Sequence, residues 1–313
     1  MQKFHFLINP VSGGGQGKTV FDFLPEIMRS MDFKEVEWER EFSIRGKFEE
    51  QIRDALADTE CLIAVGGDGT AAAVFQVLLH SPEFENVKIG LIPLGTGNDL
   101  ARVLGLYYAF VNKGLLFSVR KLLTANAKKM DLWKVSGGSV ENDFAMANYF
   151  SAGIDARIAH DFNRDRIDGK IAGNSVFANK FHYVKRFFAD RKYRLQSGEL
   201  RITDVNGEEK NFELNGNCTV IIGNIPSFAG GSNPFGKSDM SDGILEVLRI
   251  PNLGSFVKSL SVFGAGNLVI KARSVELRLA KDEFIQLDGE DFKGHFEMPV
   301  KIEFGRQINI LHL

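Results

Sequence analysis

The chain has 313 residues, which suggests about two domains, and its 44% hydrophobic and 25% charged residues are typical of a folded globular protein. This composition excludes a disordered or fibrous chain. The 38 basic and 40 acidic side chains give a formal net charge of −2, so overall charge gives no reason to expect nucleic-acid binding. The two cysteines, Cys61 and Cys218, cannot form a disulfide scaffold, which favours a reducing compartment and a cytoplasmic protein.

No targeting or membrane-spanning segment is expected. The N-terminal apolar run reaches Asn9 and Pro10 too soon for a signal-peptide core. No run approaches the ~18 apolar residues that cross a bilayer, so membrane contact is expected to be peripheral. The chain also carries 27 Phe against 5 Tyr and 2 Trp, which fits either a Phe-rich core or an apolar ligand channel.

The first third of the chain alternates strand and helix patterns. Strands are expected at Phe4–Ile8, Glu35–Phe42, Cys61–Val65 and Val87–Leu94, and helices at Val20–Met31, Phe48–Leu56, Ala71–Leu79 and Leu100–Leu104. Pro25 predicts that the first helix is kinked or begins late. The alternation is typical of a mostly parallel sheet with helices on both faces, and such sheets bind ligands at the carboxyl ends of their strands.

From about Met130 the pattern changes to strands without regular helices between them. This predicts a second, antiparallel, β-rich domain, with a boundary near residue 125 after the helical stretch Leu115–Leu123. The expected strands are Asp131–Val135, Phe144–Phe150, Leu200–Val205, Thr219–Ile222, Ile244–Ile250, Val275–Leu279, Glu283–Leu287 and Val300–Phe304.

A basic segment interrupts this second half. Residues 157–194 hold ten Lys or Arg and four Asp, so the local charge is 10 − 4 = +6. Four apolar side chains, Phe177, Phe181, Val184 and Phe188, fall on one helical face with Lys180, Lys185 and Arg186 nearby. A basic amphipathic helix suits an anionic membrane surface or a phosphate site, while an ordinary solvated helix packed by its Phe face fits the same pattern.

Three glycine-rich loops follow strands of the first half. Such loops let backbone N–H groups approach phosphate oxygens, and the following helix N-terminus favours negative charge. The first loop, Asn9 to Gly17, lacks the spacing of a Walker P-loop, so on its own a simple strand–helix turn explains it equally well. The second, Gly66-Gly67-Asp68-Gly69-Thr70, places a carboxylate where it could bind Mg²⁺ bridging phosphates.

Two further turns add acidic groups. Pro93-Leu-Gly-Thr96-Gly-Asn98-Asp99 offers a hydroxyl, an amide and a second carboxylate, and two acids facing phosphates require a cation between them. Near the C-terminus, Glu290 of the turn Asp288-Gly-Glu290 could take a proton from a substrate hydroxyl, although a hairpin with solvated acids fits the same spacing.

Together these residues resemble the diacylglycerol kinase catalytic-domain family, lipid kinases that include sphingosine kinases and bacterial diacylglycerol kinases. The resemblance covers nearly the whole chain and is nearest to the diacylglycerol kinases. The motifs occur in family order: Asn9-Pro10 with Ser12-Gly13, Gly66 to Thr70, Pro93 to Gly105, Asn148 to Ala156, Gly230-Gly231, Ser241 to Val247 and Asp288 to Glu290.

The resemblance implies an ATP site in the cleft between an N-terminal Rossmann-like α/β domain and a C-terminal antiparallel β-sandwich. The domains would be 1–125, completed by 300–313, and 126–299, with 157–194 as a basic helical insertion. The ATP-binding residues would be Asn9, Pro10, Val11, Ser12, Gly13, Ser43, Gly66, Gly67, Asp68, Gly69, Thr70, Ala71, Ala72 and Thr96.

The resemblance also implies the catalytic and metal groups. Asp68 and Asp99 would organise catalytic Mg²⁺ and the phosphates, and Glu290 would be the general base with Asp288 in support. A structural Mg²⁺ would lie at Asp242 with main-chain oxygens of Asp239 and Ile244. Where many bacterial members have an Asn-Glu pair after Thr70, this chain has Ala71-Ala72-Ala73.

The expected function is an ATP- and Mg²⁺-dependent phosphorylation of the primary hydroxyl of diacylglycerol to phosphatidic acid, at the membrane surface. The alternatives are a kinase of a sphingoid base or isoprenoid alcohol, an NAD kinase, and a nucleotide- or lipid-binding regulator without catalysis. Pro93 to Asp99 argues against NAD kinase, and the retained acids argue against the regulator. An exposed strand edge leaves a homodimer open.

Overall fold

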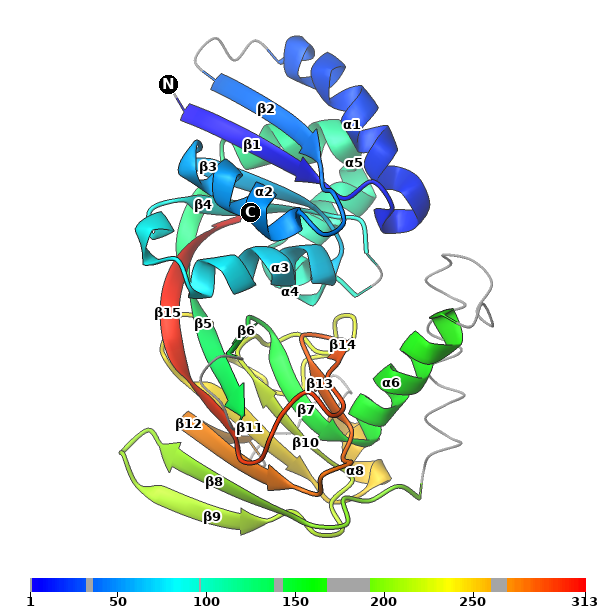
Figure 1. Ribbon diagram of the computed structural model, residues 1–313, viewed down its shortest axis with the longest axis vertical. Coiled ribbons are helices and arrows are strands. Elements are labelled where there is room, and N and C mark those ends of the chain that lie inside the picture. The colour runs from blue at the N-terminus through cyan, green and yellow to red at the C-terminus, as the bar shows by residue number, and fades with distance from the viewer. Residues whose placement is uncertain (1, 32–35, 96, 138–142, 168–191, 260–268) are drawn as a thin grey trace. The chain divides into compact units, whose positions relative to one another are not determined.

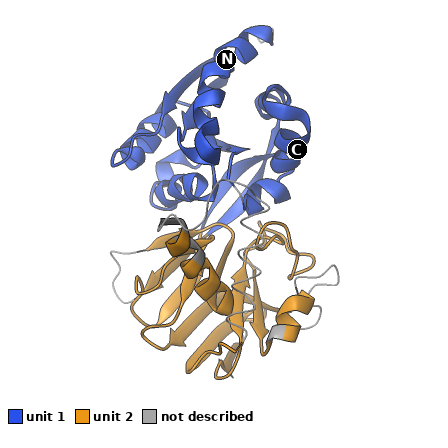
Figure 2. Ribbon diagram, turned by 90° about the vertical axis from the view of Figure 1, so that its right-hand side faces the viewer, with its two compact units in different colours: residues 1–132, 306–313 blue, residues 133–305 orange. Residues whose placement is uncertain are grey.

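The computed structural model describes residues 2–31, 36–95, 97–137, 143–167, 192–259 and 269–313. The chain divides into two compact units, one of Met1–Leu132 with Arg306–Leu313 and one of Trp133–Gly305 (Figure 2). The division falls after Leu132, within β5 (Asn126–Gly137), and the boundary expected near residue 125 lies at the start of that strand. The basic helix expected around Phe177–Phe188 lies outside the described residues.

The first unit is built on a parallel sheet. Its strands are β1 (Gln2–Ile8), β2 (Val36–Phe42), β3 (Cys61–Gly66) and β4 (Lys88–Pro93), in the order β4-β3-β1-β2 (Figure 1). The end of β15 (Val300–His312) continues the sheet beside β4, with Asn309 opposite Lys88. β3 is buried along its whole length, as expected for a central strand covered on both faces.

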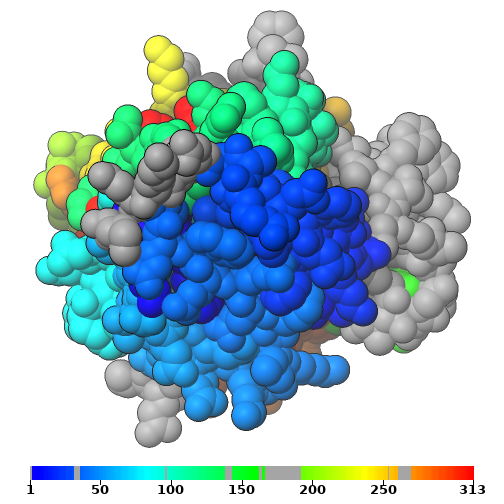
Figure 3. Space-filling view, turned by 90° about the horizontal axis from the view of Figure 1, so that it is seen from above, coloured from blue at the N-terminus to red at the C-terminus, as the bar shows by residue number. Residues whose placement is uncertain are grey.

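The helices of this unit are α1 (Ser12–Ser30), α2 (Phe48–Ala57), α3 (Asp68–Leu79), α4 (Asp99–Val103) and α5 (Leu106–Leu123), with a 3₁₀ turn at Pro82–Phe84. α1 packs with α5, and α2 packs with α3. The chain steps from β1 to β2 in one direction and then back past β1 to β3. Right-handed crossovers therefore put α1 and α2 on opposite faces of the sheet. The early elements of this unit, in blue, form most of the face in Figure 3.

The first helix begins before the expected Val20, and Pro25 does not set its start. Gly13, Gly14 and Gly15 have positive φ values of 60°, 69° and 96°, so the regular helix starts after them, and Pro25 lies inside its regular part. Only glycine adopts this left-handed backbone at little cost, which explains the run of three. α5 is longer than expected, since it begins at Leu106 and continues past a break at Gly114.

The second unit is dominated by antiparallel pairs. Its strand order is β14-β13-β7-β10-β11-β12, and the β8–β9 hairpin lies on β12. The bounds are β6 (Phe144–Met146), β7 (Tyr149–Gly153), β8 (Gly198–Asp204), β9 (Glu209–Glu213), β10 (Thr219–Gly223), β11 (Leu245–Ile250), β12 (Val269–Leu279), β13 (Ile285–Leu287) and β14 (Glu290–Asp291). Two helices, α6 (Ile154–Ile167) and α8 (Leu253–Ser259), complete its described part.

The core accounts for many of the Phe residues. Phe4, Phe6 and Phe75 in the first unit and Phe150, Phe228 and Phe256 in the second are at most 2% exposed. A second group, Phe144, Phe292 and Phe296, packs ring against ring at the edge of the main cluster of the second unit. Burial of rings without polar atoms stabilises both units, so the Phe-rich core is the interpretation that the described residues support.

Candidate functional site

The three glycine-rich loops of the first unit meet at one edge of its sheet. They follow β1, β3 and β4, whose carboxyl ends lie together because the strands are parallel. Between β1 and β3 the chain reverses its direction of travel across the sheet, and such a switch point leaves room for a ligand. The fold therefore places the predicted loops where α/β proteins bind their ligands.

Asn9 joins the first two loops. Its backbone N–H donates to the Val65 carbonyl at 2.9 Å, and its side-chain Nδ2 donates to Thr70 Oγ1 at 3.2 Å. Its Oδ1 accepts from the Val11 N–H at 3.2 Å, which turns the chain into the loop. Ser43 is held at the end of β2 by its N–H donating to the Ile8 carbonyl at 2.9 Å. Asn9 and Thr70 are thus structural partners across the site.

Close packing of the loops requires glycine. A Cβ on Gly95 would lie 2.8 Å from the Gly67 Cα, and one on Gly66 would lie 2.2 Å from Thr70 Oγ1. Gly13 combines a positive φ with a Cβ position 2.8 Å from the Leu94 carbonyl oxygen. Side chains at these positions would push the loops apart, so the glycines keep three backbone segments in contact around one space.

Asp68 links the second loop to the third. It is the first residue of α3, and its Oδ2 accepts the backbone N–H of Asn98 at 2.8 Å. Asn98 has a left-handed backbone, with φ 51°, and donates its Nδ2 to the Gly95 carbonyl at 2.6 Å. Asp99 follows at the start of α4 and is only 4% exposed. The two acids therefore belong to adjoining loops.

The remaining predicted nucleotide-binding residues of this unit lie on the same loops or the first turns after them. Pro10 and Ser12 are half-buried, Val11 is exposed, Gly69 is exposed, Ala71 is buried and Ala72 is half-buried. Thr96 lies outside the described residues. The start of α3 presents backbone N–H groups, and a helix N-terminus attracts anions. This edge has the chemistry to hold a phosphate chain and a cation with it.

In the second unit, the buried carboxylate of Asp288 joins its turn to the start of β7. It is 5% exposed; its Oδ2 accepts the N–H of Ala147 at 2.8 Å, and its Oδ1 accepts those of Asn148 and Tyr149 at 2.8 and 2.9 Å. Its own N–H donates to the Tyr149 carbonyl at 2.9 Å. A carboxylate that accepts three backbone N–H groups is well stabilised as an anion, so Asp288 fastens its turn to the start of β7.

Glu290 is exposed at the beginning of β14, two residues beyond Asp288. The intervening Gly289 donates its N–H to Gln286 Oε1 at 2.8 Å, which fixes the turn from the other side. The next residue, Asp291, lies with its Oδ2 2.6 Å from Nδ1 of His160 on α6. The turn is therefore held at Asp288, Gly289 and Asp291, and Glu290 within it is an exposed residue.

A buried polar network beside this turn was not predicted. The hydroxyls of Ser151 and Thr219 both donate to the Asp155 carboxylate, and Gln286 Nε2 donates to Ser151 Oγ at 2.8 Å. Burial raises the pKa of Asp155, and the two hydroxyl donors oppose that rise. The sequence signal was the motif Asn148 to Ala156, whose buried acid on α6 has partners on β7 and β10.

The predicted metal loop, Asp239 to Ile244, is stabilised by its own acids. Asp239 Oδ1 accepts the N–H and hydroxyl of Ser241 at 3.0 and 2.7 Å, and Asp242 Oδ1 accepts the N–H of Ile244 at 3.0 Å. Within the part of the chain that the structure describes, no three His, Cys, Asp or Glu side chains are grouped closely enough to hold a metal ion. A site here would need main-chain oxygens and water as well.

Glu246, two residues beyond Ile244, lies in β11 and is fully buried. Both of its carboxylate oxygens lack a hydrogen-bond partner, and Nζ of Lys271 is 3.9 Å from Oε1. Burial raises the pKa of Glu246 to about 8; Lys271 opposes this, and the charges of Asp242 and Asp239 add to it. These two buried oxygens lie two residues beyond the loop that the resemblance assigns to a structural Mg²⁺.

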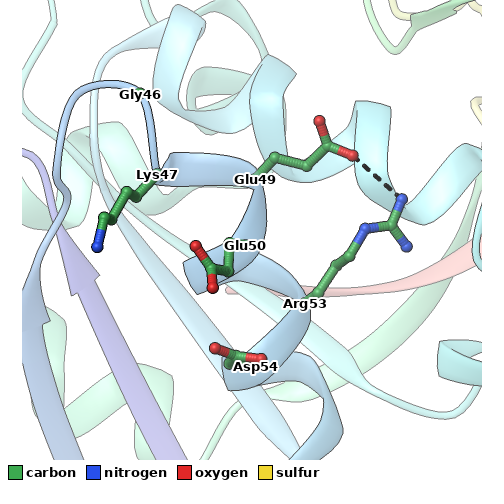
Figure 4. Close-up of a pocket in the computed structure, with 6 residues that line it drawn as sticks. All are labelled: Gly46, Lys47, Glu49, Glu50, Arg53 and Asp54. Atoms are coloured by element: carbon green, nitrogen blue, oxygen red, sulfur yellow. Dashed lines mark hydrogen bonds and ion pairs between the residues drawn. The ribbon is translucent and has the colours of Figure 1, made fainter.

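A pocket of about 410 Å³ lies elsewhere in the first unit, on the turn before α2 and on the first turns of that helix (Figure 4). Arg53 Nη2 is paired with Glu49 at 3.2 Å. None of the residues that line it is a predicted site residue: Gly46, Lys47, Glu49, Glu50, Arg53 and Asp54. No helix among the described residues is long and apolar enough to cross a bilayer.

Comparisons with known proteins bear on both units. The chain matches the family model of the diacylglycerol kinase catalytic domain over residues 3–135 and that of the diacylglycerol kinase accessory domain over residues 145–291. The eye-specific diacylglycerol kinase of Drosophila melanogaster is 28% identical over 312 residues, which cover 90% of this chain and 21% of that protein. Diacylglycerol kinase zeta of Rattus norvegicus is 26% identical over 328 residues, which cover 94% of this chain and 34% of that protein.

The chain thus spans about a third or less of the length of these curated relatives. A solved structure of a diacylglycerol kinase from Bacillus anthracis has a TM-score of 0.69 and 18% sequence identity, and covers 100% of this chain and 97% of its own. At that identity the likeness shows the fold, a mixed α/β architecture with a large β-sheet.

Proposed function

The chain belongs to the diacylglycerol kinase family, and from this premise we propose that it transfers the γ-phosphoryl group of ATP to the primary hydroxyl of diacylglycerol. The product is phosphatidic acid. The observation that carries the proposal is the set of three interlocked loops at the carboxyl ends of β1, β3 and β4, with Asp68 and Asp99 on adjoining turns. The relatives named as diacylglycerol kinases support the choice of a lipid acceptor.

In this proposal the first unit binds ATP. Backbone N–H groups of the Asn9–Gly13 and Gly66–Thr70 loops, with the N-terminus of α3, hold the phosphates. Asp68 and Asp99 would hold Mg²⁺, because carboxylate oxygens are ligands that this ion prefers. When bound, Mg²⁺ neutralises charge that develops on the phosphates during transfer. Ser43 lies at the end of β2 toward the same edge.

The second unit prepares the acceptor. Glu290 accepts the proton of the lipid hydroxyl, whose oxygen forms the new bond to the γ-phosphorus while the bond to the β,γ-bridging oxygen breaks and ADP departs. Asp288 is a positioning residue, because its carboxylate is occupied by three backbone N–H groups. A base in phosphoryl transfer chiefly orients the nucleophile, which suits an exposed carboxylate on a fixed turn.

We propose further that the protein works from the cytoplasm at the membrane surface, where its substrate is found. The basic segment 157–194 motivates this proposal, since its sequence combines an apolar face with positive charge. A sphingoid base or an isoprenoid alcohol is the nearest alternative acceptor. Neither would change the roles given to Asp68 and Glu290.

The test is transfer of γ-³²P from ATP with Mg²⁺ to lipids in mixed micelles: diacylglycerol, monoacylglycerol, sphingosine, ceramide and an isoprenoid alcohol, with NAD alongside. We expect label in phosphatidic acid alone. Glu290→Gln and Asp68→Asn should each lower kcat by about 10² to 10⁴, whereas Glu209→Gln, an exposed acid on β9, should not change it. Label in another lipid would show that diacylglycerol is not the acceptor. Wild-type turnover in both variants would refute the roles proposed for Glu290 and Asp68.

A further inference from the structure

His160 has no role in the mechanism above, although it contacts the turn that carries the proposed base. It lies on α6, which packs against β13 and β14 (Figure 1). Its Nδ1 is 2.6 Å from Oδ2 of Asp291, the residue that follows Glu290. A carboxylate only accepts hydrogen bonds, so Nδ1 donates, and the short distance is typical of a hydrogen bond to a charged group. The tertiary fold brings the two partners together, since they are 131 residues apart in the sequence.

The ring of Phe284 holds the imidazole of His160 from a second side. The two ring centroids are 5.2 Å apart, with an interplanar angle of 65°. The Arg157 guanidinium, one turn earlier on the same face of α6, lies over the Phe284 ring at 5.5 Å. Phe284 immediately precedes β13, and its carbonyl accepts the Gly153 N–H at 3.2 Å, at the end of β7. The orientation of His160 is therefore set by ring packing as well as by its hydrogen bond to Asp291.

Asp291 transmits this contact to the turn. Its Oδ2 accepts from His160, and its Oδ1 accepts the N–H of Lys293 at 3.1 Å, so one carboxylate joins β14 both to α6 and to the loop that follows. Glu290 thus lies between Asp288, which is bound to the start of β7, and Asp291, which is bound to α6. Neighbouring residues of a strand point to opposite faces, so the direction of the Asp291 side chain constrains that of Glu290.

We infer that His160 is a positioning residue for phosphoryl transfer, which acts through Asp291 to orient Glu290. The inference rests on the proposed function, in which Glu290 accepts the proton of the lipid hydroxyl. A base in phosphoryl transfer works chiefly by orienting the nucleophile, so a displacement of about 1 Å lowers the rate strongly. The side chains of His160 and Asp291 are 26% and 29% exposed, so water can solvate either when the pair is broken. Loss of the pair should therefore affect turnover more than stability.

The test removes the hydrogen bond and keeps the packing. His160→Phe retains an aromatic ring against Phe284 but has no donor for Asp291. The full chain is assayed with ATP, Mg²⁺ and diacylglycerol in mixed micelles, and its Tm is measured in parallel. We expect kcat to fall by about 10- to 100-fold, while the KM for ATP and the Tm stay close to wild type. His160→Asn, whose amide can donate from near the position of Nδ1, should recover part of the lost kcat.

A Glu290→Gln background separates positioning of the base from a general structural effect. If His160 acts through Glu290, adding His160→Phe to Glu290→Gln should lower kcat by less than about twofold more. A further loss as large as in the wild-type background would overturn the inference. The matched control is His295→Phe, since His295 is exposed and its ring nitrogen lies 3.2 Å from the Lys293 carbonyl oxygen. This control should leave kcat unchanged.

Asp291→Ala tests the pair from the other side and keeps the test decisive if His160→Phe does not fold. It should lower kcat to a similar extent, and the double variant should lose little more. A kcat within about twofold of wild type in either folded variant would overturn the inference and leave the proposed function standing. Wild-type kcat in Glu290→Gln would refute both the base and its positioning residue. A wild-type chain that labels no lipid would refute the proposed function, and the inference with it.

Discussion

Substituting Asp288 by Asn tests how the candidate base is held. The change keeps the size and shape of the side chain, and Asn tolerates the positive φ of 49° at this position. What it removes is the negative charge and one acceptor. The carboxylate accepts one N–H on Oδ2 and two on Oδ1, so an amide can satisfy at most one of these two sides.

The magnitude follows from that count. With the amide oxygen toward Asn148 and Tyr149, two charged hydrogen bonds become neutral, at a cost of about 1 kcal/mol each. The amide nitrogen then faces the Ala147 N–H, donor against donor, and leaves a buried N–H unsatisfied at about 1–3 kcal/mol. We therefore expect Asp288→Asn to lower the free energy of unfolding of the second unit by about 3–5 kcal/mol.

The assay is urea unfolding followed by the fluorescence of Trp133, which is fully buried in the second unit. A Trp38→Phe background removes the other of the two tryptophans. The midpoint should fall with an unchanged m-value. The matched control is Asp282→Asn, an exposed acid of the same type, expected within about 0.5 kcal/mol of wild type. A loss below about 1 kcal/mol in Asp288→Asn would show that the three hydrogen bonds do not stabilise the turn.

Three other outcomes are expected. Burial raises the folded-state pKa of Asp155 above its unfolded value of about 3.9, so its contribution to stability is fully present below about pH 4 and is lost as pH rises toward the raised pKa. Asp155→Asn should therefore make the free energy of unfolding in urea depend less on pH over that window. An unchanged pH dependence would contradict this. Burial raises the pKa of the Cys61 thiol to about 12 and that of Cys218 to about 11, so iodoacetamide at pH 7.4 should label neither until the chain is unfolded in urea, as mass spectrometry would show. Gly95→Ala places a Cβ 2.8 Å from the Gly67 Cα and should lower stability by about 1–3 kcal/mol and weaken ATP binding in calorimetry; wild-type affinity would mean that the loops can separate.

The sequence predicted the first-unit loops well because their signals are local. Each apolar strand ends in a run of glycines and acids, and parallel strands bring such ends to one edge without further information. The family models confirm the resemblance on which the assignment of these loops was based. Local signals also explain the errors. Gly114 interrupts the helical pattern, so the first half of α5 was not predicted. β9 is a polar hairpin strand that can be recognised only by its pairing with β8.

Buried polar residues were harder to predict because their partners are distant in sequence. Asp155 accepts one hydrogen bond from the hydroxyl of Ser151, four residues earlier, and another from that of Thr219, 64 residues further on. Glu246 sits in an apolar strand pattern, and only its burial beside the Asp239–Ile244 loop distinguishes it from a solvent-facing acid. A strand's alternation indicates which face a residue occupies, but it does not identify what lies opposite that face.

Acids in glycine turns illustrate the same limit. Asp288 and Glu290 share one short turn, in which the resemblance gives Glu290 as the base and Asp288 as its support. The structure separates them by exposure and hydrogen bonding: Asp288 is 5% exposed and accepts three backbone N–H groups, whereas Glu290 is exposed. A carboxylate stabilised as an anion by three donors is a poor proton acceptor, since those donors favour its charged form. The three hydrogen bonds that Asp288 accepts therefore support testing Glu290, and not Asp288, as the base.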